Sequence, residues 1–147
     1  MRLFGSVGDA GAGMGTPAPT ILVVDDEPGV RAALQDALEL EGYDVVAVEN
    51  GLKAVMTLTD RPVDAVVLDG EAWPTGGLGL AKQMKDELPD CPPVLSLIAR
   101  RDDRWLATWS QSDAIVAHPI DAPELTEALA ELLRRRLAGV PVRRAVH

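Results

Sequence analysis

The segment Ile21-Leu22-Val23-Val24-Asp25-Asp26-Glu27-Pro28 sets the architecture of the chain. Its four consecutive apolar residues show no polar alternation, which is typical of a strand buried on both faces of a parallel sheet. The run ends in two carboxylates, and Pro28 favours the first turn of a helix. The segment therefore predicts a strand and a following helix, with acidic groups at the carboxyl end of the strand.

The same unit recurs along the chain. Apolar runs that predict strands cover Ile21–Val24, Asp44–Val48, Val63–Leu68, Val94–Ile98 and Ala114–Ala117. Apolar residues at helical spacing predict helices over Val30–Leu40, Leu52–Thr59, Leu78–Leu88, Asp103–Gln111 and Ala122–Leu137, the last with Asp121 as its N-cap. Alternating strands and helices indicate an open parallel sheet with helices on both faces, whose ligand crevice lies at the carboxyl ends of the strands.

Composition narrows the class of protein. The 147 residues suit one domain, 47% of them are hydrophobic, and the net charge of −9 disfavours nucleic acid as a partner. The single cysteine, Cys91, allows neither an internal disulfide nor a zinc site. No apolar run reaches the roughly 20 residues that span a bilayer, so we expect a cytoplasmic protein without direct membrane insertion.

Three segments are expected. Residues 1–19 are rich in Gly, Ala and Pro and predict a disordered lead-in, within which translation could start at Met1 or Met14. Residues 20–137 form the folded domain. Residues 138–147 form a short basic tail, too short for a DNA-binding output module.

Three carboxylates follow predicted strands: Asp25 and Asp26 after the first and Asp69 after the third. Close like charges need a proton or a cation between them, and hard carboxylate oxygens suit Mg²⁺. The alternative is that two of the three simply cap turns and helices. The spacing along the alternating pattern favours the site.

These motifs resemble the response-regulator receiver domains. Residues 21–28 resemble the opening strand of that family, and Val66-Val67-Leu68-Asp69 resembles its phosphoacceptor strand. Gly77-Leu78 matches the start of its third helix, and His118-Pro119 falls on its Lys-Pro. The resemblance covers roughly residues 20–137. It implies a flavodoxin-like (βα)5 three-layer sandwich with parallel strand order 2-1-3-4-5.

The resemblance also implies a function. A sensor histidine kinase or phosphotransfer protein would phosphorylate Asp69, with Mg²⁺ bound by Asp25, Asp26, Asp69 and the backbone carbonyl of Glu71. The protein would be a single-domain response regulator that signals by docking to a protein or a larger complex. It would not be an enzyme, apart from self-catalysed phosphoryl transfer and dephosphorylation.

Three switch positions depart from the family pattern. Ile98 replaces a Ser or Thr whose hydroxyl grips the phosphoryl group, and isoleucine cannot donate a hydrogen bond. His118 replaces a Lys, and nearby carboxylates favour its charged form, although a purely structural role is equally open. Ile115 replaces the aromatic residue that reports switching. Ser96 shares a strand face with Ile98 but comes two residues earlier, farther from the carboxyl end of the strand.

These departures leave a second hypothesis open. The chain would then be a pseudo-receiver, an accessory subunit that binds its partner whatever its phosphorylation state. Trp73, Trp105 and Trp109 are the predicted partner-binding residues, because exposed tryptophans are enriched at interface hot spots. The loop around Trp73 resembles stand-alone actinobacterial receivers, which suggests docking on a larger assembly such as the respiratory NADH dehydrogenase, with membrane-peripheral placement through that partner.

Two enzyme classes rank lower. The pair Asp69 and Glu71 is faintly similar to the Mg²⁺-dependent phosphatases of the haloacid dehalogenase type, whose acceptor ends the first strand rather than the third. A nucleotide site would require a Gly-rich phosphate loop after the first strand, and Asp-Asp-Glu-Pro stands there instead.

Overall fold

Five parallel strands form one sheet. The structure is a computed structural model, and it describes residues 18–69, 77–88, 90–99 and 112–137. The strands are β2 (Thr20–Val24), β3 (Asp44–Val48), β4 (Ala65–Asp69), β5 (Val94–Ile98) and β6 (Ala114–Ala117). They lie in the order β3-β2-β4-β5-β6, with every neighbouring pair parallel. Numbered from the first described strand this is 2-1-3-4-5, which confirms the predicted flavodoxin-like fold.

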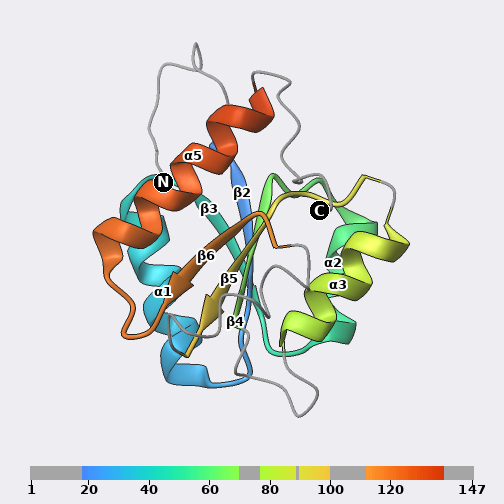
Figure 1. The fold of residues 1–147 in the computed structure, drawn as a ribbon, viewed down its shortest axis with the longest axis horizontal. Helices are drawn as coiled ribbons and strands as arrows, with labels where there is room; N and C mark the ends of the chain where they lie inside the picture. The colour runs from blue at the N-terminus through green and yellow to red at the C-terminus, as the bar shows by residue number, and fades with distance from the viewer. Residues whose placement is uncertain (1–17, 70–76, 89, 100–111, 138–147) are drawn as a thin grey trace.

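Helices cover both faces of the sheet. The described helices are α1 (Pro28–Leu40), α2 (Gly51–Asp60), α3 (Gly77–Glu87) and α5 (Ala122–Leu137). In Figure 1, α1 and α5 pack on one face, and α2 and α3 pack on the other. The helix predicted over residues 103–111 lies outside the described part of the chain.

The core is divided by the sheet into two apolar layers. Leu34 and Leu38 of α1 and Leu125 and Leu129 of α5 pack against one face. Ala54 of α2 and Met84 of α3 pack against the other, together with the strand residues Leu22, Val24, Val66, Leu68 and Val94. Both faces of β2, β4 and β5 are therefore buried, which explains why their sequences show no polar alternation.

Capping residues fix where the helices begin and end. The carboxylate of Glu27 accepts hydrogen bonds from the backbone amides of Gly29 and Val30 at the start of α1. Asp121 accepts one from the amide of Glu124, which confirms it as the N-cap of α5. After α1 the chain turns at Gly42, whose φ of +94° favours glycine.

One predicted strand boundary moves slightly. The third strand in sequence was predicted as Val63–Leu68, but it runs from Ala65 to Asp69. Val63 is buried next to the strand without joining the ladder, so its hydrophobicity misplaced the start. Pro19, in the predicted N-terminal segment, directly precedes β2, and its carbonyl accepts a hydrogen bond from the amide of Asp44 at the start of β3.

A buried ion pair ties α3 to the far edge of the sheet. Lys85 Nζ lies 2.5 Å from Oδ2 of Asp113, and both side chains are almost completely buried. The same Oδ2 accepts a hydrogen bond from the amide of Val94, and Lys85 also donates to the carbonyl of Pro92.

Among the described helices, none is long and apolar enough to cross a membrane.

Candidate functional site

The carboxyl ends of four parallel strands bring the predicted site residues to one edge of the sheet. Asp25 directly follows β2, Asp69 is the last residue of β4, Ile98 is the last residue of β5, and His118 directly follows β6. Because all the strands run the same way, these four positions meet at a single edge. The predicted convergence of Asp25 and Asp69 is therefore present.

Asp25 and Asp69 form the centre of this edge. Asp25 is fully buried and Asp69 nearly so, and their side chains are within hydrogen-bonding reach of each other. Oδ1 of Asp25 accepts a hydrogen bond from the amide of Glu27 at 3.0 Å. Its Oδ2 is buried and receives no hydrogen bond from any described group. Two ionised carboxylates cannot donate to one another, so a proton or a cation is needed between them.

The pKa of Asp25 reflects its burial beside a second carboxylate. Burial raises the pKa of Asp25 from its ordinary value of 3.8 to about 7, against the lowering effect of the Glu27 amide. The hydrogen bond and charge of Asp69, and to a smaller extent the charge of Asp26, contribute to this rise. The carboxyl of Asp25 therefore gains or loses its proton near neutral pH when no cation is bound.

The residues present fit a small hard cation only in part. Asp25 and Asp69 supply adjacent oxygens, whereas Asp26 is exposed at the rim. Across the described ranges, no three His, Cys, Asp or Glu side chains are arranged to hold a metal ion. The further predicted ligand, the backbone carbonyl of Glu71, lies outside the described residues. An acceptor-only donor set with one unmet buried oxygen is nevertheless the chemistry that Mg²⁺ prefers.

His118 faces Asp69, the predicted phosphoacceptor. Its Nε2 lies 3.7 Å from Oδ1 of Asp69, and its side chain is about one third exposed. Its amide donates to the carbonyl of Ile98 at 2.7 Å, and the peptide bond to Pro119 is cis. When protonated, His118 places a positive charge beside Asp69, as the family's lysine would.

The other two switch positions are apolar. Ile98 is fully buried and forms a small cluster with Ala117 and the half-buried Ile115. Ser96 does not compensate for the missing hydroxyl, because its Oγ lies 2.5 Å from Oγ of Ser112, away from the acidic edge. Neither Ile98 nor Ser96 of β5 therefore offers a side-chain donor to an anion at the acidic edge.

Sequence reasoning missed two features beside the pocket. Arg31 Nη1 donates to the backbone carbonyl of Asp25 at 2.9 Å, a contact that helical periodicity does not predict. Its place in the first turns of α1, six residues after Asp25, was the available signal.

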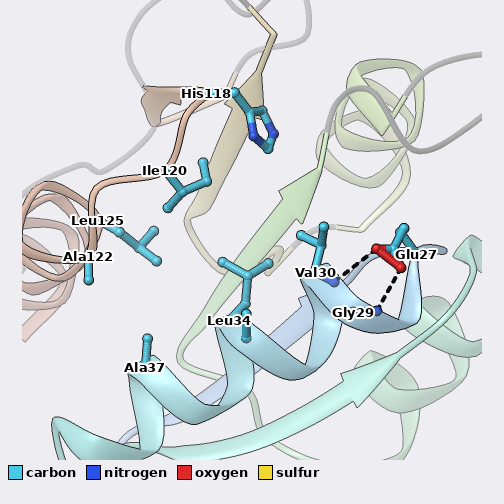
Figure 2. Close-up of a pocket in the computed structure, with 10 residues that line it drawn as sticks. Glu27, Gly29, Val30, Leu34, Ala37, His118, Ile120, Ala122 and Leu125 are labelled. Carbon is cyan, nitrogen blue, oxygen red and sulfur yellow. Dashed lines mark hydrogen bonds between the residues drawn. The ribbon is translucent and has the colours of Figure 1, made fainter.

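The second feature is an apolar groove of about 420 Å³ between α1 and the segment that leads from β6 into α5. Figure 2 shows Val30, Leu34 and Ala37 along one wall, facing Ile120 and Leu125. Glu27 and His118 lie at its polar end, so the groove opens toward the acidic edge.

The predicted partner-binding residues Trp73, Trp105 and Trp109 lie outside the described residues.

Comparison with known proteins places the chain in a family. The response regulator receiver domain pattern matches residues 21–130, which lie within the predicted domain. A response regulatory protein of Mycobacterium tuberculosis, itself uncharacterized, is 42% identical over 120 residues, covering 78% of this chain and 90% of that protein. The phosphate regulon transcriptional regulatory protein PhoB of Pseudomonas aeruginosa is 34% identical over 123 residues, and the match spans only 54% of it.

Solved structures agree with the fold. The response regulator protein TrrA of Thermotoga maritima, determined in complex with Mg²⁺-BeF, superposes with a TM-score of 0.69 at 34% identity, covering 78% of this chain and 99% of that one. A putative response regulator of Chloroflexus aurantiacus superposes with a TM-score of 0.75 at 24% identity, covering 80% of this chain and 99% of that one. The family pattern, the relatives and the strand order agree: this chain belongs to the response regulator receiver domains of two-component signalling.

Proposed function

We propose that this receiver takes up a phosphoryl group on Asp69 and then signals by docking to another protein. Mg²⁺ would be held by Asp25, Asp26, Asp69 and the backbone carbonyl of Glu71. One observation carries the proposal: the buried Oδ2 of Asp25 has no hydrogen-bond partner among the described residues, and Asp25 lies beside Asp69 at the carboxyl edge of the sheet. The Mg²⁺-BeF complex of the TrrA relative supports the same chemistry.

The chemistry assigns a role to each described residue. A carboxylate oxygen of Asp69 attacks the phosphorus of a phosphohistidine or an acyl phosphate, forming a new P–O bond. The bond from phosphorus to the donor breaks, and its electron pair leaves with the donor. Bound Mg²⁺ would neutralise the charge that builds on the phosphoryl oxygens. His118 in its protonated form adds a positive charge next to Asp69.

The groove suits a protein phosphodonor. A histidine kinase or phosphotransfer protein presents its phosphohistidine on a protein surface, so it must dock beside the acceptor. The apolar walls of the groove would bury side chains of that partner, while its polar end opens beside His118.

Mass measurement tests the acceptor. The protein is incubated with Mg²⁺ and acetyl phosphate, and its intact mass is recorded beside that of Asp69→Asn. We expect a phosphoryl adduct on the parent alone, and none when EDTA replaces Mg²⁺. An adduct of equal yield on Asp69→Asn would remove Asp69 from this role.

A second function has one observation in its favour. The apolar cluster of Ile98, Ile115 and Ala117 contains neither the hydroxyl nor the aromatic side chain that the family uses at the first two of these positions to report phosphorylation. We infer as the alternative a pseudo-receiver that binds its partner regardless of phosphorylation. Binding that survives Asp69→Ala but is lost in Trp105→Ala would favour it. The respiratory NADH dehydrogenase as that partner stays a prediction.

A further inference from the structure

All but one of the polar atoms of Asp25 form hydrogen bonds with described residues. Its amide donates to the carbonyl of Val48 at 3.1 Å, and its Oδ1 accepts from the amide of Glu27 at 3.0 Å. Its backbone carbonyl accepts from Nη1 of Arg31 at 2.9 Å. Oδ2 alone has no described donor, and Asp69 is its neighbour. Three contacts thus fix the residue so that one oxygen faces the site.

The contact from Arg31 is the one made by a long side chain. Arg31 is the fourth residue of α1, is half-buried, and its guanidinium reaches back over the start of the helix. A cation near a helix N-terminus opposes the helix dipole, so helix stability does not explain this residue. The hydrogen bond to Asp25 does.

We propose that Arg31 is a positioning residue that sets the affinity of the acidic pocket for Mg²⁺ by holding the backbone of Asp25. The proposal rests on the metal site described under the proposed function. Arg31 contacts the backbone carbonyl of Asp25 and neither of its carboxylate oxygens, so it would act through the backbone of Asp25. Groups that orient metal ligands in this way commonly change metal affinity by about 10- to 100-fold when removed.

Removing Arg31 has two possible effects on the affinity for Mg²⁺, and they have opposite signs, so one measurement can separate them. If Arg31 acted only as a nearby positive charge, its removal would reduce repulsion and tighten Mg²⁺ binding by roughly 2- to 5-fold. If Arg31 positions Asp25, its removal weakens Mg²⁺ binding despite the lost repulsion. The direction of the change therefore separates positioning from simple electrostatics.

The experiment titrates Mg²⁺ alone into the full chain by isothermal titration calorimetry. The variants are Arg31→Gln, Arg31→Lys and the matched control Arg61→Gln. Arg61 is exposed, pairs loosely with Asp44 at the opposite edge of the sheet, and loses the same charge. We expect Arg31→Gln to raise the Kd about tenfold or more. We expect Arg31→Lys to fall between that and the parent, and Arg61→Gln to match the parent.

Amide hydrogen exchange gives a second readout without metal. Loss of the Arg31 contact should loosen the Glu27 amide, which bonds Oδ1 of Asp25, and speed its exchange roughly 3- to 10-fold. The buried helix amides of Leu34 and Leu38 should exchange as in the parent, which shows that the variant is folded.

The outcomes distinguish the two proposals. Mg²⁺ binding by the parent that is unchanged or tighter in Arg31→Gln would overturn the role of Arg31 and leave the proposed function intact. No binding by the parent would overturn the metal site itself, and with it the link from Arg31 to Mg²⁺. Unchanged exchange at Glu27 would overturn the positioning of Asp25.

Discussion

Lys85 of α3 and Asp113 before β6 form a buried ion pair, with 2.5 Å between Nζ and Oδ2. The pair lies at the amino ends of β5 and β6, at the opposite end of the strands from the acidic pocket. Oδ1 of Asp113 has no described hydrogen-bond partner, so Lys85 carries much of the compensation for this charge. Lys85→Met should therefore destabilise the protein by about 3–5 kcal/mol, because it leaves a buried carboxylate without its cation. Urea unfolding at neutral pH measures the change.

The matched control is Lys82→Met on the same helix. Lys82 pairs with Asp86 at 2.9 Å, but both side chains are substantially exposed. Exposed pairs contribute little, so the control should lose less than about 1 kcal/mol. Equal losses in the two variants would show that the buried pair has no special weight.

Asp25→Asn should stabilise the metal-free protein at alkaline pH. Burial first, and then Asp69, raise the pKa of Asp25 to about 7, so the folded state holds its proton more tightly than the unfolded chain does. The contribution of Asp25 is thus fully present below about pH 4 and is lost as the pH rises through about 7.

We expect Asp25→Asn to exceed the parent by about 1–2 kcal/mol at pH 8 and to lose this advantage near pH 4. The value is set below the full shift because Asp25 and Asp69 titrate together, so the shift does not belong to Asp25 alone. Chemical unfolding of both proteins across this range gives the difference, in which slopes from other carboxylates cancel. A difference that does not vary with pH would contradict the shifted pKa.

Ile98→Thr should trade stability for phosphoryl binding. Ile98 is fully buried against Ile115 and Ala117, so a hydroxyl there should cost about 1–3 kcal/mol. The same hydroxyl would donate to a phosphoryl oxygen on Asp69, so the fraction of protein phosphorylated by acetyl phosphate should rise. Ile98→Val is the control, since it removes volume without adding a donor. A rise in both variants would assign the effect to space rather than to the donor.

His118→Lys should accelerate the uptake of phosphoryl groups. Nε2 of His118 lies 3.7 Å from Oδ1 of Asp69, and lysine carries its charge at every physiological pH on a longer side chain. The initial rate of adduct formation with acetyl phosphate should rise in His118→Lys and fall in His118→Gln. Equal rates in all three proteins would mean that His118 is a structural residue of the cis-proline turn.

Ala33→Glu should block a protein phosphodonor but not a small one. Ala33 lines the groove and is exposed, so a charged side chain there should not disturb folding. Transfer from an autophosphorylated histidine kinase should slow by about tenfold or more, while labelling by acetyl phosphate stays at the parental rate. Ala32→Glu, exposed on the same helix outside the groove lining, serves as the control. Loss in both variants would point to general repulsion.

Much of the fold was predictable because hydrophobic pattern and backbone geometry agree. Uninterrupted apolar runs identified all five described strands, and the family resemblance supplied their order. Asp25 and Asp69 could be placed together because parallel strands end at one edge. The start of β4 was misplaced because Val63 is buried outside the ladder, a distinction that hydrophobicity does not make.

The contacts that orient the site were not predictable in the same way. The hydrogen bond from Arg31 to Asp25 depends on which way a long side chain folds, and periodicity reports only its helix face. Lys85 and Asp113 are far apart in sequence, and charged residues are so seldom fully buried that both are expected on the surface. The groove arises between α1 and the segment leading from β6 into α5, which are distant in sequence, so no local pattern marks it.

Asp69 is itself a rung of the sheet, paired in register with Leu97 of β5. Its main chain is therefore anchored as firmly as the core, whereas Asp25 sits in the turn after β2. A phosphoryl group on Asp69 would be attached to a stationary point. A conformational change caused by phosphorylation must then occur in the residues that surround Asp69, while the backbone of Asp69 itself stays in place.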